Sequence, residues 1–91
     1  MAKVIITLKI MPESPDTDLH AIEKSAKHEI EKYGAEYGKT DIEPVAFGLK
    51  ALKIMIISEE SKGSSDELEK KISELPGVNS CETIDVRRTI G

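Results

Sequence analysis

The hydrophobic pattern of residues 4–11 has a period of two. One side of the alternation is wholly apolar and consists of Val4, Ile6, Leu8 and Ile10. The other side mixes apolar and polar residues, namely Ile5, Thr7, Lys9 and Met11. Because side chains along a β-strand point alternately to its two faces, this pattern predicts a first strand with one buried face.

Apolar residues then recur at steps of three and four, which is the spacing of one face of a helix. They are Leu19, Ile22, Ala26, Ile30 and Tyr33. The spacing predicts an amphipathic helix of about four turns that ends at Gly34, because glycine readily adopts the left-handed conformation of a helix end. The candidates for the N-cap residue are Ser14, which precedes Pro15, and any of residues 16–18.

After a predicted loop through Gly38-Lys39, two strands are expected to meet at a tight turn within residues 42–54. Pro44 restricts the first of these strands to a sheet edge or a strand start, because proline cannot donate to a hydrogen-bond ladder. Gly48 adopts positive φ without steric cost, so the chain is expected to reverse at Phe47-Gly48. Phe47 is the only phenylalanine, and a side chain at a reversal is hard to bury. It is therefore the first functional candidate.

The strand after the reversal is predicted to be central in a sheet. Its core-facing residues are Leu52, Ile54 and Ile56. A polar loop over residues 59–65 leads to an S-x-x-E capping box, Ser64 to Glu67, which opens a second helix. The apolar stripe of that helix is Leu68, Ile72 and Leu75, and the helix is expected to stop at Pro76-Gly77.

A last strand is predicted from about Val78 to Arg88. Its alternation places Ile84 and Val86 toward the core, with Ile90 as a further candidate. The residues expected on its other face are Thr83, Asp85 and Arg87.

The predicted element order is strand, helix, strand, strand, helix, strand. Right-handed crossovers in both halves give an α+β, ferredoxin-like βαββαβ sandwich, with a four-stranded antiparallel sheet and two helices on one face. Residues 1–91 are expected to form one domain, because a chain of this length has room for a single core. The face of the sheet away from the helices would mix apolar and charged residues. That mixture suits either a surface covered intermittently by a partner or an ordinary solvated face.

The composition and net charge exclude several classes of protein. The chain is 38% hydrophobic and 33% charged, which is typical of a soluble globular protein. Its net charge of −4 argues against a general binder of nucleic-acid backbone, which usually carries a basic surface. Cys81 is the only cysteine, so an intrachain disulfide is excluded and a reducing, cytoplasmic setting is expected. The N-terminal apolar run alternates too strongly for a signal peptide or a membrane span.

The sequence contains no group of residues with the spacing of a known catalytic site. His20 and His28 are eight residues apart on one helix, about 12 Å along its axis, which is too far to share a metal. The chain has neither of the glycine-rich phosphate-binding motifs, and no cofactor is expected. An RNA-recognition module would need aromatic residues on its central strands, which are absent here. A small-molecule-binding regulatory domain of the same fold stays open as the alternative function.

Residues 44–52, Pro-Val-Ala-Phe-Gly-Leu-Lys-Ala-Leu, closely resemble the P-[IV]-x-F-G-[LI]-K-x-L segment of the elongation factor 1-beta family. Residues 9–13 and 16–19 also look like this family. The resemblance extends over essentially the whole chain, which is similar to the compact archaeal form.

The resemblance implies a guanine-nucleotide exchange factor that acts on elongation factor 1-alpha by binding it, without covalent chemistry. In the family, the phenylalanine matching Phe47 inserts into a pocket of the GTPase, so the resemblance assigns Pro44, Phe47, Gly48 and Lys50 to partner binding. In proteins of this family, the C-terminal end reaches towards the magnesium and phosphates at the nucleotide site of the GTPase. Eukaryotic members carry a lysine next to their last residue. Here that lysine is missing, and Arg87 or Arg88 is the candidate for the positive charge.

Overall fold

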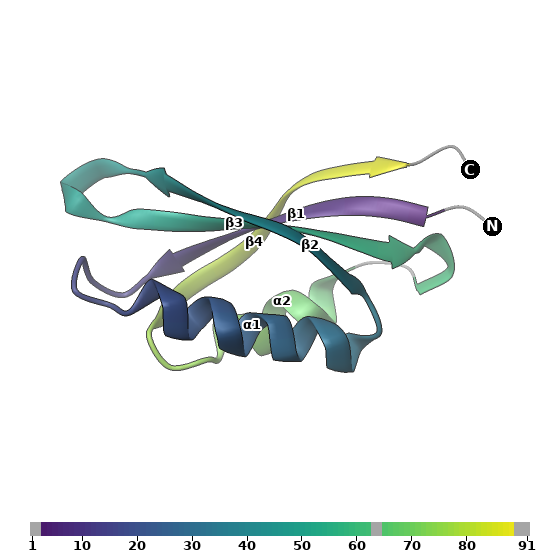
Figure 1. The fold of residues 1–91 in the computed structure, drawn as a ribbon, viewed down its shortest axis with the longest axis horizontal. Coiled ribbons are helices and arrows are strands. Elements are labelled where there is room, and N and C mark those ends of the chain that lie inside the picture. Colours follow the sequence, from purple (N-terminus) through teal and green to yellow (C-terminus); the bar gives the residue numbers. More distant parts are fainter. Residues whose placement is uncertain (1–2, 63–64, 89–91) are drawn as a thin grey trace.

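A computed structural model describes residues 3–62 and 65–88 of the chain. The elements are β1 (Lys3–Pro12), α1 (Leu19–Tyr33), β2 (Glu36–Pro44), β3 (Lys50–Glu59), α2 (Asp66–Ser73) and β4 (Val78–Arg88). Short 3₁₀ turns occupy Ala46–Gly48 and Glu60–Lys62. The strands form one antiparallel sheet in the order β2-β3-β1-β4, and both helices lie against the same face of it (Figure 1). The predicted α+β, ferredoxin-like fold is confirmed.

The core lies between the sheet and the helices. The two central strands, β1 and β3, contribute fully buried side chains at the predicted positions, among them Leu8, Ile10, Leu52, Ile54 and Ile56. The helices contribute Ile22, Ala26 and Ile30 from α1 and Leu68 and Ile72 from α2. Full burial of one such aliphatic side chain stabilises the fold by roughly 1.5–3 kcal/mol. The apolar positions predicted for these strands and helices therefore form the core between the sheet and the helices.

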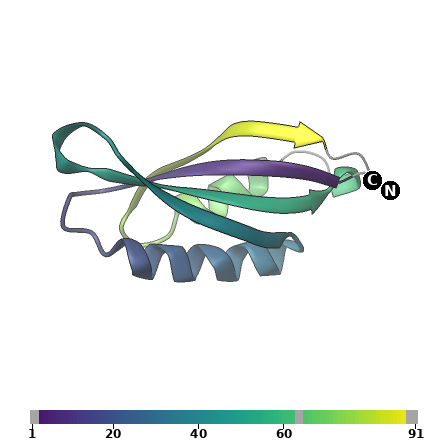
Figure 2. The same cartoon turned by 45° about the horizontal axis from the view of Figure 1, so that its top comes forward.

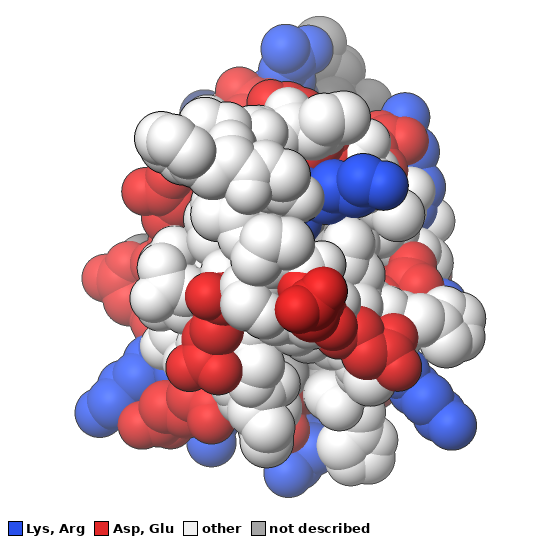
Figure 3. Space-filling view, turned by 90° about the vertical axis from the view of Figure 1, so that its left-hand side faces the viewer, with Lys and Arg blue, Asp and Glu red and all other residues white. Residues whose placement is uncertain are grey.

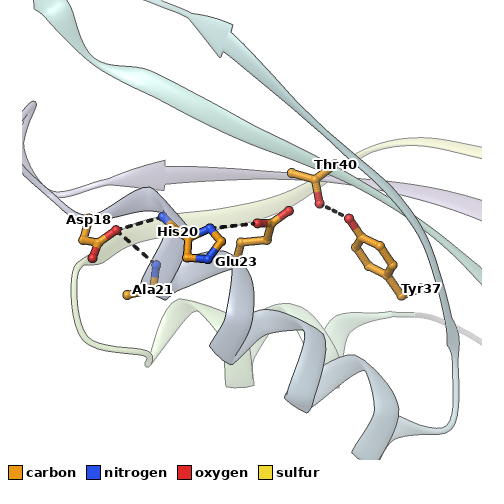
Figure 4. A network of polar contacts seen from close by, with 6 residues as sticks. All are labelled: Asp18, His20, Ala21, Glu23, Tyr37 and Thr40. Atoms are coloured by element: carbon orange, nitrogen blue, oxygen red, sulfur yellow. Dashed lines mark hydrogen bonds and ion pairs between the residues drawn. The ribbon is translucent and has the colours of Figure 1, made fainter.

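The first turn of α1 is capped by Asp18. Its Oδ1 accepts hydrogen bonds from the backbone N–H groups of His20 at 3.0 Å and Ala21 at 3.2 Å (Figure 4). Ser14 is not available as a cap, because the Ser14 N–H and hydroxyl both bond to the hydroxyl of Thr17. At the other end Gly34 takes the predicted left-handed conformation, with φ of 96°.

The predicted loop through Gly38-Lys39 is wrong, because β2 begins at Glu36 and continues through both residues. The register of β2 against β3 shifts between Tyr37 and Lys39, so Gly38 forms a bulge. A Cβ atom at Gly38 would lie 2.7 Å from the carbonyl oxygen of Met55. Glycine is required here by the close approach of the neighbouring strand, and it does not end the strand.

The predicted inward position of Ile84 is also wrong. Thr7 lies opposite Asp85 but Leu8 lies opposite Thr83, so Ile84 is an extra residue in a β-bulge. Ile84 is 42% exposed and lies outside the core. One extra residue reverses the alternation of side chains, which turns Thr83 toward the helices instead of away from them.

Thr83 is held there by two contacts with the α2 region. Its hydroxyl bonds the hydroxyl of Ser65 at 2.8 Å, and its backbone N–H donates to the carboxylate of Glu69. Val86, opposite Ile6, does face the helix side as predicted but stays 57% exposed. Ile90 lies outside the described residues.

The N-cap of α2 is Ser65, without a hydrogen bond from its side chain to the helix backbone. Its hydroxyl is engaged by Thr83 instead. The predicted capping box used Ser64, which lies outside the described residues. The helix ends at Ser73, and Leu75 packs against the core from the following turn.

Candidate functional site

Phe47 is at the tip of the β2–β3 hairpin and is 93% exposed. The turn is closed by the Leu49 N–H, which donates to the Ala46 carbonyl at 3.2 Å, and by the Val45 N–H, which donates to the Leu49 carbonyl at 2.8 Å. The chain reverses at Phe47-Gly48, as predicted. A large aromatic side chain therefore projects into solvent from a hydrogen-bonded turn.

The backbone of this turn is strained. Phe47 has φ 61° and ψ 32°, and it is the only non-glycine residue with positive φ in the described part of the chain. Gly48 follows with φ 76°. Two consecutive positive φ values are typical of type I′ hairpin turns, which strongly prefer Asn or Gly. Holding a phenylalanine in this conformation costs about 1–3 kcal/mol, and no burial of its ring offsets that cost.

Pro44 and Lys50 lie directly opposite each other where the hairpin strands enter the turn. Both are exposed, and the sheet order places the Pro44 strand at an edge, which is one of the two positions predicted for it. Lys50 and Gly48 line one wall of a cleft of about 410 Å³, and residues of the β1–α1 loop line the other wall. Pro44, Phe47, Gly48 and Lys50 are thus brought together at one end of the molecule.

Seen from this end, the surface is largely uncharged, with acidic side chains gathered across its middle and most basic side chains toward its margins (Figure 3). Farther down the hairpin, Lys53 of β3 lies opposite Lys9 of β1, on the sheet face away from the helices. The ammonium of Lys53 forms an ion pair with Glu43 of β2. The pKa of the Glu43 carboxyl is lowered mainly by its hydrogen bond with Lys53 and by the charge of Lys53. The charge of Lys9 lowers it to a smaller extent. The charges of two lysines therefore act on one carboxylate of the hairpin.

Arg87 and Arg88 lie far from Phe47. They are at the end of β4, opposite the hairpin tip along a molecule whose longest Cα extent is 42 Å (Figure 1). Arg87 Nε donates to Asp85 Oδ2 at 2.8 Å. Arg88 forms an ion pair with Glu60, and this hydrogen bond raises the pKa of the Arg88 guanidinium.

The two arginines also differ in the face that they occupy. Arg87 is opposite Ile5, on the open side of the sheet, whereas Arg88 is opposite Val4, on the helix side. The candidate site residues thus form two groups at opposite ends of the fold.

Other reactive groups do not form a site in the described residues. Burial raises the pKa of the Cys81 thiol to about 12, with the charges of Glu69 and Glu82 adding to the effect. Within residues 3–62 and 65–88, no group of three or more His, Cys, Asp or Glu side chains is arranged to hold a metal ion. The same residues contain no helix long and apolar enough to cross a membrane.

Pro15 enters the sequence prediction only as a helix-start residue, yet it lies beside the hairpin tip. A Cβ atom built at Gly48 would lie 4.0 Å from both Cβ and Cγ of the Pro15 ring. No spacing in the sequence signals that these two segments lie near each other, because the tertiary fold brings them together.

The family model for the EF-1 guanine nucleotide exchange domain matches residues 5–89, which include the hairpin and most of the sheet. This chain belongs to that family. Its relatives include Elongation factor 1-beta of Methanothermobacter thermautotrophicus, 43% identical over 97% of this chain and 98% of that protein. Elongation factor 1-beta of Methanobrevibacter smithii is 44% identical with the same coverage. The predicted archaeal elongation factor 1-beta resemblance is confirmed.

Solved structures share the fold of this EF-1 exchange domain at low sequence identity. The ACT domain of the GTP pyrophosphokinase of Chlorobium tepidum has a TM-score of 0.61 and 17% identity, over 90% of this chain and 99% of that chain. The C-terminal domain of the MgtC protein of Mycobacterium tuberculosis has a TM-score of 0.60 and 12% identity, over 98% and 87% of the two chains. These likenesses concern the sandwich alone.

Proposed function

We propose that this EF-1 exchange domain promotes GDP release from elongation factor 1-alpha during translation elongation, with Phe47 as its central contact. The observation that carries the proposal is the conformation of Phe47, which is 93% exposed at a positive φ of 61°. An exposed, strained aromatic residue contributes nothing to the core of its own domain. Its place within the segment that resembles elongation factor 1-beta supports a role in binding the GTPase.

The energetics of Phe47 suit an interface anchor. Burial of a phenylalanine in a pocket of the partner is worth roughly 1.5–3 kcal/mol. Truncation of a central aromatic anchor commonly costs 2 kcal/mol or more of binding energy. In the proposed complex Pro44 and Lys50 flank this anchor, and Gly48 permits the turn that presents it.

Exchange in this proposal needs no covalent step by the factor. The hairpin enters a pocket of the GTPase and disturbs the neighbouring nucleotide and magnesium site, so that the empty GTPase is favoured. By thermodynamic linkage, a factor that weakens GDP binding is itself bound more weakly by the GDP-loaded GTPase, by the same ratio. Binding of GTP then displaces the factor, and residues 1–91 act as a single exchange domain in the cytoplasm.

Arg87 or Arg88 is proposed to supply the positive charge near the magnesium site. Both arginines are already paired within the chain, with Asp85 and with Glu60. Because these ion pairs are exposed to solvent, water and salt screen them, and either arginine can leave its partner at small cost. A GTPase that contacts both Phe47 and these arginines must extend along the 42 Å axis of the domain.

The decisive test is release of fluorescently labelled GDP from elongation factor 1-alpha, with and without the protein at micromolar concentration. Acceleration of GDP release that depends on the concentration of the protein is expected. If the release rate is the same with and without the protein, the proposed function is wrong.

A further inference from the structure

The outer edge of β4 is open over its last residues. In the sheet order β2-β3-β1-β4, this strand pairs with β1 on one side only. Figures 1 and 2 both show the C-terminal half of β4, in yellow, along the rim of the sheet. An edge strand presents unpaired N–H and C=O groups to solvent, and such a row can pair with a strand of another molecule.

The bulge at Ile84 divides this edge into a protected part and an open part. Before the bulge, the Thr83 backbone N–H donates to the carboxylate of Glu69, so α2 already satisfies it. Bulges and such covering contacts protect sheet edges from further pairing. Beyond the bulge, residues 85–88 have no backbone hydrogen bond outside their ladder with β1, within the part of the chain that the structure describes.

The charged side chains of this open segment are complementary to themselves. Asp85 and Arg87 both lie on the open face of the sheet, and Arg87 Nε donates to Asp85 Oδ2 at 2.8 Å. In an antiparallel pair of two copies with a two-fold axis at Val86, position 85 of each copy lies opposite position 87 of the other. Both cross-strand pairs then join a carboxylate to a guanidinium, which stabilises antiparallel pairing. A two-fold axis requires such self-complementarity, because both subunits use the same patch.

Val86 gives this pairing an apolar centre. It faces the helix side of the sheet and is 57% exposed, whereas Val4 and Ile6 on β1 are buried. These three residues line a cleft of about 440 Å³ between β4 and the α2 region. The two-fold axis places Val86 of the second copy opposite Val86 of the first, beside this cleft. Both side chains then lose exposed apolar area, which favours association.

The other edge of the sheet lacks this combination. β2 also carries an opposite-charge pair, Lys39 and Asp41, whose charged groups are 3.6 Å apart. Pairing of two copies about the residue between them would put Thr40 on the axis. The Thr40 hydroxyl is already bonded to Tyr37 (Figure 4), and the Gly38 bulge interrupts the strand beside it. β4 is therefore the better edge for pairing.

We propose that two copies of this chain associate through residues 85–88 of β4, antiparallel and with a two-fold axis at Val86. Their sheets then form one continuous sheet across the axis. This inference goes beyond the proposed exchange function and does not depend on it. Only a few residues of each strand take part, so the interface is small and transient, with an expected dissociation constant on the order of 100 µM.

Sedimentation velocity of the full chain, from about 10 µM to about 2 mM, measures this association, and the average mass should rise toward that of a dimer. Asp85→Arg and Arg87→Asp each place like charges opposite one another in both cross-strand pairs. Each variant alone should weaken self-association about tenfold or more. An equal mixture of the two variants restores opposite charges in both pairs, so association should return to the level of the unchanged protein.

The charges of β2 provide matched controls. Asp41→Arg changes the net charge by the same amount as Asp85→Arg, and Lys39→Asp by the same amount as Arg87→Asp. A general effect of net charge on association would therefore appear in both sets. Neither β2 variant should alter self-association. All four side chains are substantially exposed, and circular dichroism verifies that each variant is folded.

A chain that stays monomeric at about 2 mM would overturn this inference. Equal weakening by the β2 variants, or no recovery in the mixture of the two β4 variants, would overturn the pairing through β4. The GDP-release assay uses micromolar protein, well below the expected dissociation constant, so the monomer acts in it. Loss of either result therefore leaves the other intact.

An NMR measurement tests the position of the axis directly. In a mixture of isotope-labelled and unlabelled chains at about 1 mM, a filtered NOE is expected between the Val86 methyl groups of the two copies. A dimer that shows no such NOE would refute the two-fold axis at Val86.

Discussion

Phe47 and Gly48 are consecutive residues with positive φ, 61° and 76°, at the tip of the β2–β3 hairpin. Glycine adopts this conformation freely, whereas phenylalanine is disfavoured there by about 1–3 kcal/mol. The ring is 93% exposed, so it recovers almost nothing by packing. The residue type at position 47 is therefore suboptimal for folding, and the predictions for the hairpin follow from that conflict.

Phe47→Asn is expected to stabilise the fold while impairing exchange. Asn-Gly is a preferred sequence for a turn with two positive φ values, so the free energy of unfolding should rise by about 1 kcal/mol. Urea denaturation measures this change. Ile42→Asn, which alters an exposed apolar residue in the extended β2 strand, is the control and should not stabilise, because Asn is disfavoured in strands. A lower stability of Phe47→Asn would refute the argument from strain.

Phe47→Ala is expected to slow stimulated GDP release by about tenfold or more, because truncation of an aromatic anchor commonly costs 2 kcal/mol or more. The thermal midpoint should stay close to that of the unchanged protein, since the ring lies outside the core. Ile42→Ala provides a control for loss of an exposed apolar side chain from the same hairpin. An unchanged release rate for Phe47→Ala would exclude this residue as the anchor.

The double variant Arg87→Ala/Arg88→Ala is expected to lower the maximal stimulated rate of GDP release. Its free energy of unfolding should change little, because both arginines form ion pairs that are exposed to solvent. Lys70→Ala/Lys71→Ala removes the same charge from the exposed surface of α2 and serves as the control. If both double variants give the same maximal rate of GDP release, the arginines have no specific role in exchange.

Gly38→Ala is expected to destabilise the protein by about 1–3 kcal/mol, the usual cost of forcing an extra carbon into packed structure. A Cβ atom at this position would be 2.7 Å from the backbone oxygen of Met55, so β2 and β3 would have to separate. Urea denaturation of Gly38→Ala beside Lys39→Ala, the exposed neighbour, measures the effect. Equal stability of the two variants would show that the bulge accommodates a side chain.

Cys81 is expected to resist alkylation in the native protein. Its pKa of about 12 leaves the thiol protonated at pH 8, and the reacting species is the thiolate. Iodoacetamide should therefore modify native Cys81 about a hundredfold or more slowly than the urea-unfolded chain, and the native rate should rise as pH increases. Mass spectrometry measures the modified fraction. Equal rates in the native and unfolded states would contradict the buried position of the thiol.

The sequence by itself determined the order of the elements, the core stripes of β1, α1 and β3, and the reversal at Phe47-Gly48. These features follow from local rules, because apolar periodicity and the conformational limits of glycine and proline act within a few residues of the chain. The same segment carried the family resemblance. The missing N–H group of Pro44 limited its strand to a sheet edge or a strand start, and the sheet order decided for the edge.

Only the tertiary structure decided the two bulges, because each depends on a neighbouring strand. Gly38 lies at a bulge inside β2, where the Met55 carbonyl leaves no room for a side chain, and the extra residue Ile84 turned Thr83 toward Glu69. The proximity of Pro15 to Gly48 arises in the same way. Residues far apart in the sequence meet only when strand register is set, and register is a property of paired strands that no single segment contains.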